Sequence, residues 1–491
     1  MDLMKERVRS ISMRFSRSFR FPKRLLAPLS AAAAITRGMV AGVSCAAMVL
    51  VPTAAKAQSG ERSPMIVRDA EIEKLLMDYA TPVLKAAGIR VSAVKVILIQ
   101  NPTFNAFVAN GQKIFVNTGA LIDSRTPNEI IGVLAHESGH IAGGHLARLH
   151  QQIANAKILS VVGMLAGAGA MVGSGGGRVG QGGIGAGGVL AGSQELVRRN
   201  LLSYQRSEEQ AADQAAVRYL TATGQSAKGL LDTMKRMGDN ALFRTSGLDP
   251  YVLSHPLPQE RMSALEQLAT KSPAYNTKDS ASLVARHELM RAKLSGFTER
   301  PETVMRRYPP SDRSVAARYA RAILAYKTAR SSQAVTLMDE LLREQPKNPY
   351  FWEMKGQALL ESGRAREAIA PLRQAVALAP SSSLIRAMLG RAMVASGDPG
   401  TIDQAIRELS NATQREPELA DAFRDLSTAY ARKGDIGMAE LSASQYYFAR
   451  GEWDQAATQA TRAKAKLKPN SPAWLRADDI LAYQPERPPG K

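Results

Sequence analysis

Apolar residues recur at helical spacing along most of the chain, and a short block rich in β-branched residues interrupts this pattern near residue 100. From residue 67 to residue 87 they recur every three or four positions, which predicts an amphipathic helix. Residues 91–100 and 113–117 each predict a strand, joined by a turn-rich connection. The first half of the chain is therefore expected to mix helices with a few strands.

The connection between the two strands contains Asn105-Ala106-Phe107-Val108, which we interpret as a candidate sheet edge. An extended peptide can pair with an exposed edge strand through its backbone, whatever its sequence. Asn105 and Phe107 are thus candidates for substrate contact or for support of a site. A plain buried hairpin is the alternative interpretation.

From about Ala281 the pattern changes to paired, alanine-rich helices. Prolines follow the second helix of each pair at intervals of 37, 34 and 37 residues: Pro309, Pro346, Pro380 and Pro417. A period near 34 residues, with small residues where two helices cross, is typical of the tetratricopeptide repeat (TPR). The clearest unit carries Trp352, Gly356, Leu359, Ala368, Leu372, Ala375 and Pro380.

These repeats predict a mainly α protein that ends in an α-solenoid over residues 281–470, followed by a C-terminal extension, 471–491, with a disordered end. A solenoid of this kind forms a concave groove suited to an extended segment or a partner helix. A packing domain that only braces the first half is the alternative. Basic residues here are interleaved with acids and no stacking platform is present, so we expect no nucleic-acid partner.

The most informative stretch is an apolar run, residues 130–146, interrupted by His136 and His140 with Glu137 beside the first. On a helix the two imidazoles lie on one face and can bind one Zn²⁺. The glutamate is placed to take a proton from the attacking water. This is the HExxH pattern of zinc peptidases.

The helix that carries this motif is expected to begin after Thr126, a cap residue followed by proline, and to continue to about Leu149. On such a continuous helix His145, nine residues after His136, would lie on the opposite face. We therefore interpret His145 and His150 as structural residues rather than metal ligands.

A catalytic zinc needs a third protein ligand and an open position. A second predicted helix offers Glu208 and Glu209. Because one residue turns a helix by about 100°, only one of the two can face the metal. These two residues by themselves leave the choice open.

Three stretches carry a family resemblance: His136-Glu137-x-x-His140, His145-Leu146-Ala147-Arg148 and Glu209-x-x-Ala212-Asp213. They resemble the gluzincin metallopeptidases, a family that includes the CAAX prenyl protease, the membrane protease HtpX and the periplasmic β-barrel assembly-enhancing proteases. The resemblance implies an α+β metallopeptidase domain, residues 58–280, with one zinc ion per chain. It further implies that Glu209 is the third ligand and that Asp213 orients a ligand histidine.

His255, Pro256 and Arg261 resemble the β-barrel assembly-enhancing branch of the family, in which this histidine can reach the zinc. His255 could stabilise an oxyanion, or take the fourth metal position and close the site, and both roles together require its loop to move. A turn histidine held by proline is the alternative. Arg261 would pair with a carboxylate near the site or with the substrate backbone, or would be an ordinary surface charge.

Residues 1–57 are interpreted as a signal peptide that is cleaved after Ala57. A long basic region precedes an apolar segment from Met39 to Val51, and Ala55-Lys56-Ala57 is a typical cleavage signal. A retained membrane anchor is the alternative, although the apolar run is shorter than the roughly 20 residues that span a bilayer.

Cleavage would remove ten basic and two acidic residues and lower the net charge from +20 to +12. It would also remove the only cysteine, Cys45. Export without disulfides suits a bacterial periplasm. The remaining basic charge could favour an anionic membrane or acidic partners.

Residues 158–193 combine an apolar segment with a glycine-rich one and contain a single charged residue, Arg178. We interpret them as a flap near the site or a loop in peripheral contact with a membrane. A spacer without a role, or burial against the TPR domain, are the alternatives.

The sequence as a whole predicts an exported zinc endopeptidase whose TPR domain recruits substrates or partners. The resemblance implies that the substrates are misfolded or stalled outer-membrane β-barrel proteins and that the partners are the barrel-assembly machinery. A chaperone or adaptor, acting through the TPR groove with an inactive or gated zinc site, is one alternative. A membrane-bound protease is another, and it would require residues 158–193 to insert.

Overall fold

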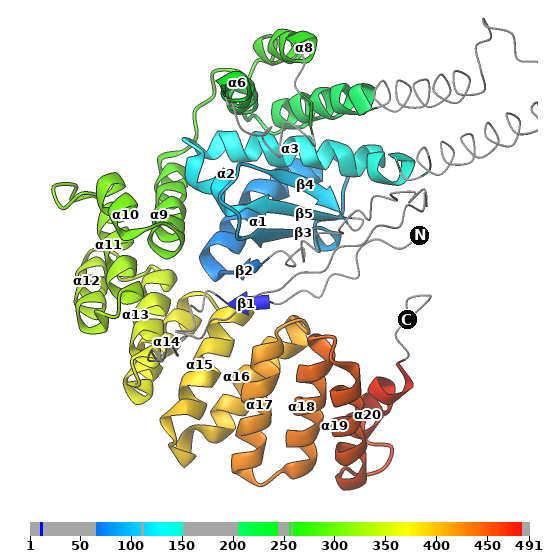
Figure 1. The fold of residues 1–491 in the computed structure, drawn as a ribbon, viewed down its shortest axis with the longest axis vertical. Coiled ribbons are helices and arrows are strands. Elements are labelled where there is room, and N and C mark those ends of the chain that lie inside the picture. Colours follow the sequence, from blue (N-terminus) through cyan, green and yellow to red (C-terminus); the bar gives the residue numbers. More distant parts are fainter. Residues whose placement is uncertain are drawn as a thin grey trace, which may run out of the picture.

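The computed structural model describes residues 10–12, 65–109, 112–149, 151, 205–243, 255–256 and 259–483 (Figure 1). The predicted flap at residues 158–193, the end of the C-terminal extension and all but three residues of the predicted signal lie outside these ranges. The structure confirms a mainly α fold in which an α+β unit precedes a long array of paired helices.

The α+β unit contains a five-stranded sheet with the order β1-β2-β3-β5-β4. Its strands are β1 (Ser10–Ser12), β2 (Ile66–Arg68), β3 (Lys95–Ile99), β4 (Ala106–Ala109) and β5 (Lys113–Asn117). Strands β3 and β5 are parallel, and β4 runs antiparallel to β5. Because β4 has a strand neighbour on one side only, it is an edge of the described sheet. Its bounds are shifted by one residue from the predicted edge segment, residues 105–108.

Two local predictions differ from the structure near this sheet. The predicted first helix begins later, as α1 (Ala70–Ala86), because Ile66 and Val67 pair with β3 and are buried there as β2. Asp69 then caps α1 by accepting a hydrogen bond from the Ile72 amide at 3.0 Å. The predicted strand 91–100 is shorter, because a 3₁₀ turn, η1 (Val91–Ala93), precedes β3.

Helix α3 (Pro127–Gly143) is the centre of the α+β unit and is buried along most of its length. The Thr126 side chain caps it by accepting from the Glu129 amide, as the sequence predicts. The prediction that this helix continues to Leu149 is wrong. Gly144, at φ +66°, ends the helix in the left-handed region, and residues 145–149 form a separate helical segment.

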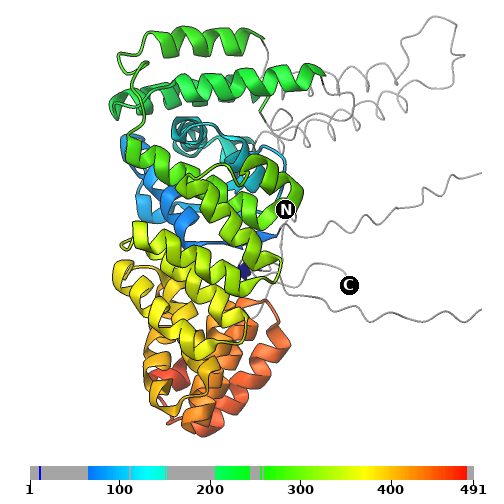
Figure 2. The same cartoon turned by 90° about the vertical axis from the view of Figure 1, so that its left-hand side faces the viewer.

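Further helices surround α3. The short α2 (Thr118–Asp123) follows β5, and a helix through residues 205–222 leads to α6 (Lys228–Phe243) and α8 (Gln259–Thr270). Figure 2 shows α6 and α8 stacked at one end of the molecule, with the sheet between them and the helical array.

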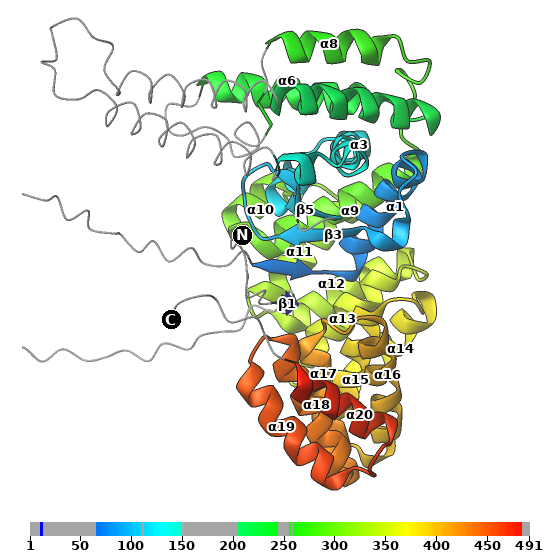
Figure 3. The same cartoon turned by 90° about the vertical axis from the view of Figure 1, so that its right-hand side faces the viewer.

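The helical array begins beside α2 and curves beneath the sheet (Figures 1 and 3). Its helices are α9 (Ala281–Thr298), α10 (Pro301–Arg307), α11 (Val315–Lys327), α12 (Ser331–Glu344), α13 (Pro349–Glu361), α14 (Ala365–Leu378), α15 (Ser383–Ser396), η2 (Pro399–Thr401), α16 (Ile402–Arg415), α17 (Ala420–Lys433), α18 (Ile436–Ala449), α19 (Trp453–Lys466) and α20 (Pro472–Ala482). Each of the four prolines used to predict the repeat lies two residues beyond the end of a second helix. Helix α20 packs against α18 and α19, so the array continues into the predicted extension.

Close helix crossings explain the small residues of the repeat. A Cβ placed on Gly356 would lie 2.4 Å from Cγ of Leu372, and one placed on Gly390 would lie 2.5 Å from Cγ of Leu409. Both glycines therefore let the two helices of a pair meet at distances that any larger residue would prevent.

A fully buried ion cluster joins the α+β unit to the array. Lys293 Nζ of α9 lies 2.8 Å from Asp69 Oδ2, 3.3 Å from Glu71 Oε2 and 3.8 Å from Glu353 Oε2 of α13. The Tyr319 hydroxyl of α11 donates to Glu71 Oε2 at 3.0 Å. Burial raises the pKa of Glu353 to about 8, whereas Asp69 and its neighbours outweigh burial and keep the pKa of Lys293 well above its usual value.

A second contact lies farther along the array. Arg68 of β2 pairs with Glu416, and Lys95 Nζ of β3 lies 2.9 Å from Glu418 Oε1, in the loop between α16 and α17. Ion pairs thus link the array to the α+β unit in both of these regions. Among the described helices, none is both long enough and apolar enough to cross a membrane.

Replacing the buried lysine should weaken the junction. Lys293→Met leaves three buried carboxyl groups without their cation, so the free energy of unfolding should fall by about 3–5 kcal/mol. Lys355→Met is the matched control, because Lys355 pairs with Asp339 near the surface and its loss should cost about 0–1 kcal/mol. Urea denaturation of both variants tests this, and equal losses would contradict the assigned role of Lys293.

Candidate metal centre

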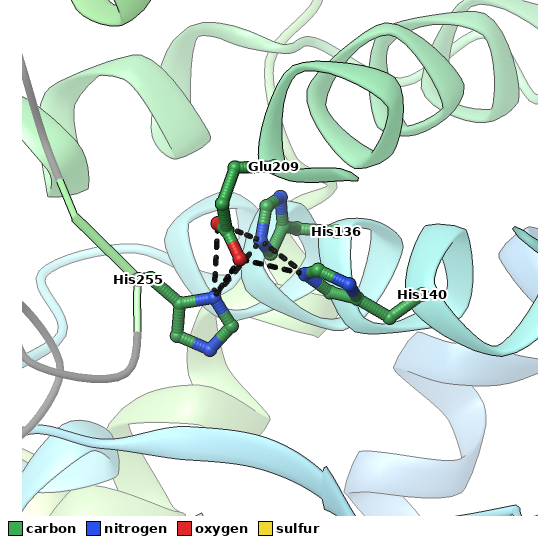
Figure 4. Close-up of side chains that lie close together, drawn as sticks. All are labelled: His136, His140, Glu209 and His255. Carbon is green, nitrogen blue, oxygen red and sulfur yellow. Dashed lines mark hydrogen bonds and ion pairs between the residues drawn. The ribbon is translucent and has the colours of Figure 1, made fainter. Parts of the chain in front are cut away.

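Three helices and one short segment bring most of the predicted site residues together. Helix α3 supplies His136, Glu137 and His140, and the helix 205–222 supplies Glu209 and Asp213. His255 lies in the described segment 255–256, ahead of α8, which carries Arg261. Figure 4 shows the side chains of His136, His140, Glu209 and His255 pointing toward one another.

The close approach of the two helices depends on Gly139. A Cβ at this position would lie 2.9 Å from the Ala212 carbonyl oxygen and 3.3 Å from the Ala212 Cβ. Gly139 and Ala212 thus face each other where the two backbones meet. Gly139 lies three residues after His136, and Ala212 lies three residues after Glu209. This spacing lets donor atoms from both helices meet at one point.

Most donor-atom separations in the cluster are close to those of a tetrahedral metal site, and one donor atom from each of the four residues lies within 4.8 Å of the others. His136 Nε2 lies 3.1 Å from His140 Nε2, 3.3 Å from Glu209 Oε2 and 3.4 Å from His255 Nδ1. Glu209 also lies 3.4 Å from His140 Nε2 and 3.1 Å from His255 Nδ1. Donors at about 2.0–2.1 Å from a tetrahedral zinc are about 3.3 Å apart, so the imidazole and carboxylate set fits this ion.

A buried network holds His136 in place. Its Nδ1 lies 2.9 Å from Asp213 Oδ1, which leaves Nε2 for the centre of the cluster. Arg261 donates to both oxygens of Asp213, at 2.7 and 3.0 Å, and its Nη1 lies 2.9 Å from Glu209 Oε2. Arg261 is itself only 2% exposed, so it is a buried clamp on two carboxylates rather than a surface charge.

The electrostatics of the cluster favour a cation. Burial lowers the pKa of His136, but Asp213 and Glu209 outweigh burial and raise the pKa to about 9. Burial dominates at His140 and lowers its pKa to about 4. Burial opposes the charge on Glu209, yet His255 and the other two histidines hold its pKa far below the usual range. A neutral His140 and an ionised Glu209 are the forms in which these side chains bind a metal cation.

Glu137 lies beside the cluster and is not part of it. Its side chain is fully buried, and burial raises its pKa. Its Oε1 lies 3.5 Å from His255 Nε2, so the His255 ring lies between Glu137 and the donor cluster. The backbone of Val108 in β4 also acts on the Glu137 carboxylate, which places the edge strand next to it.

The predicted position of His145 on the opposite face of the helix is wrong. Because α3 ends at Gly143, His145 does not lie on the opposite face but turns back, and its Nδ1 lies 2.8 Å from His140 Nδ1. His145 Nε2 lies 2.6 Å from Glu208 Oε2. It is not one of the four donors. The pair Gly143-Gly144 was the signal in the sequence, since adjacent glycines commonly end a helix. His150 lies outside the described residues.

The two candidates of the predicted edge segment, Asn105 and Phe107, are not among the four donor residues. Phe107 of β4 stacks on Phe115 of β5, with ring centroids 5.2 Å apart. The backbone carbonyl of Asn105 accepts from the Asn117 amide at 2.9 Å. Both residues therefore anchor β4 to its neighbour β5.

Comparison with known proteins agrees with this geometry. Residues 67–269 match peptidase family M48, which is metal-dependent, and residues 319–383 match the tetratricopeptide repeat. The chain carries an M48 peptidase domain followed by TPR repeats. The M48 match begins in β2 and ends in α8, so it includes every residue of the donor cluster.

Curated relatives of this chain carry protease names. The β-barrel assembly-enhancing protease of Yersinia pestis is 26% identical over 65% of this chain and 65% of its own length. The protein of the same name from Escherichia coli K12 is 24% identical over 78% of this chain and 76% of its own. Protease HtpX of Shewanella denitrificans, also an M48 peptidase, is 40% identical over 16% of this chain and 28% of its own length. The chain thus spans about two thirds to three quarters of the length of these two β-barrel assembly-enhancing proteases.

The contact between Asp213 and His136 can be tested through metal affinity. Asp213→Asn keeps the shape of the side chain but removes the charge that holds His136 and Arg261, so affinity for added Zn²⁺ should fall by about 10–100-fold. Competition with a zinc chelator measures this. Asp232→Asn, an exposed change on α6, is the control and should bind as wild type. Equal affinities for all three proteins would contradict the role of Asp213.

Proposed function

We propose that this protein is an exported zinc-dependent endopeptidase that degrades misfolded or stalled envelope proteins. The observation that carries the proposal is a cluster of four side chains in which His136 and Glu209 lie 3.1–3.4 Å from each other and from the remaining donors, with the buried Glu137 beside them. The M48 domain and the relatives named as β-barrel assembly-enhancing proteases support it. Outer-membrane β-barrel proteins are the proposed substrates, and the barrel-assembly machinery is the proposed partner.

In this proposal His136, His140 and Glu209 hold one Zn²⁺. When bound, the ion supplies Lewis acidity, which polarises the scissile carbonyl and acidifies the attacking water. Glu137 accepts the proton of that water and delivers it to the leaving amine. Its burial suits this task, because a raised pKa makes the carboxylate a stronger base.

His255 is the proposed gate of the site. Its Nδ1 occupies the fourth corner of the donor set, and its Nε2 faces Glu137 at 3.5 Å. A zinc site with four protein donors has no open position, whereas a catalytic site needs one. Displacement of His255 would free both the fourth corner and the space in front of Glu137. In the open state the same ring could donate to the oxyanion.

Strand β4 is the proposed docking edge for the substrate backbone. It is the outermost described strand on its side of the sheet, it packs against α3, and the Val108 backbone lies near Glu137. A substrate strand added to this edge would run past the base without demands on its sequence. Asn105 and Phe107 would support this by fixing β4 on β5.

The TPR array is the proposed recruiting domain, and the mature protein is proposed to begin after Ala57 in the periplasm. A second function has one observation in its favour. Because His255 completes the donor set, the site is closed as it stands, which also suits a chaperone or adaptor that acts through the TPR groove.

The role of Glu137 can be separated from metal binding. Glu137→Gln should retain about one zinc per chain but lose cleavage of an unfolded protein such as casein, by at least about 100-fold, because the base is gone. Zinc content and casein cleavage are measured on the same samples, with Glu266→Gln on α8 as the control. A Glu137→Gln protein that still cuts would refute the proposed mechanism. If zinc is bound and neither protein cuts, the chaperone function gains support.

Removal of the gate should speed the reaction. His255→Ala opens the fourth corner, so casein cleavage should rise several-fold over wild type while zinc affinity falls modestly, because one of four donors is lost. His287→Asn is a matched change at a buried histidine outside the site, held by Tyr79 and Ser124, and should not accelerate cleavage. Slower cleavage by His255→Ala would favour an oxyanion role over a gate.

A further inference from the structure

The metal ligand His140 has a second hydrogen-bonding partner on the side away from the donor cluster. Its Nε2 faces the cluster, 3.1 Å from His136 Nε2. Its Nδ1 lies 2.8 Å from Nδ1 of His145. One of these two Nδ1 atoms must therefore carry the proton and the other must accept it.

Metal binding decides which atom donates. A neutral His140 that binds through the Nε2 lone pair must carry its proton on Nδ1. Nδ1 of His145 must then be the acceptor, so His145 carries its own proton on Nε2. That atom lies 2.6 Å from Glu208 Oε2, and a carboxylate can only accept. The carboxylate thus fixes the tautomer of His145, which in turn fixes the tautomer of His140.

We propose that Glu208 and His145 form a two-step hydrogen-bond relay that orients His140 for zinc, so both are positioning residues of the metal centre. The inference rests on the proposed zinc site. His136 receives the same support in one step from Asp213 at 2.9 Å. The neighbours Glu208 and Glu209 then serve the same ion in different ways: Glu209 as a ligand, and Glu208 through two histidines.

The local backbone is built to admit this contact. A Cβ placed on Gly143 would lie 2.1 Å from Nε2 and 2.4 Å from Cδ2 of His145, so any other residue there would displace the ring. Gly144, at φ +66°, turns the chain so that His145 comes back over the end of α3. His145 is 7% exposed, and Arg148 Nη2 holds Glu208 Oε2 at 2.8 Å from the outer side.

The test is zinc affinity in a set of variants of the full chain, measured by chelator competition. His145→Phe keeps a ring but cannot accept, so affinity should fall by about 10–100-fold. His145→Asn places an amide oxygen near the position of Nδ1 and should recover most of the loss. Gly143→Ala removes no polar group but displaces the His145 ring, so it should weaken zinc binding as His145→Phe does.

Two controls separate orientation from packing. His287→Asn should lower the unfolding temperature of the zinc-free protein without changing zinc affinity, as expected for a buried histidine far from the cluster. The unfolding temperature of each variant without zinc reports its effect on the fold alone. Zinc affinity in His145→Phe equal to wild type, or equally weak in His145→Phe and His145→Asn, would overturn the relay.

The outcome for the relay is distinct from that for the proposed function. If wild type binds no zinc at all, the proposed metal centre is refuted and the relay with it. If wild type binds zinc and cleaves casein while His145→Phe binds equally well, only the relay is refuted. Proteolysis is therefore not needed to read the result.

Discussion

The metal centre depends on how closely two helices can approach each other. Gly139 of α3 faces Ala212 of the helix 205–222, and only small residues allow the separation that brings Glu209 to His136 and His140. The negative charges of buried carboxylates must be balanced by nearby positive charge, because burying an unpaired charge costs free energy of folding. Arg261 pairs with the carboxylates of Glu209 and Asp213. The imidazoles and the Glu209 carboxylate that meet beside it form a set of ligands that could bind a metal cation.

The sequence predicted the features that depend on local spacing. The HExxH motif, the Thr126 cap and the repeat prolines are all patterns within one or two helices, and the structure has them where expected. The family resemblance, which the comparisons confirm, proposed Glu209 as a ligand and Asp213 as its support. Glu209 is one of the four clustered residues, and Asp213 lies beside His136. The predicted path of α3 failed because a single left-handed residue, Gly144, redirects the chain and moves His145 to the side of His140. A helical wheel cannot describe a residue beyond such a break.

Local sequence patterns also could not predict contacts between residues far apart in the chain. Val67 fits an amphipathic helix by periodicity, but the pairing of Ile66 and Val67 with β3 makes them a strand. Lys293 and Glu353 are ordinary charged residues of two helices in the sequence, yet the fold buries both against Asp69 and Glu71. This junction, together with the pairs at Glu416 and Glu418, fixes the array against the sheet that carries the edge strand. A polypeptide held by the array would therefore be presented to the peptidase domain at a defined place.

The order of the strands has a consequence for the protein in concentrated solution. The chain passes from β3 to the outermost strand β4 and returns to the interior as β5. Strand β4, like β1 at the other end of the described sheet, therefore has a single strand neighbour. An edge that accepts an extended backbone without regard to side chains does not distinguish a foreign strand from one of another copy of this chain. Crowded copies would compete for their own edges, and self-association would then act as a natural brake on activity.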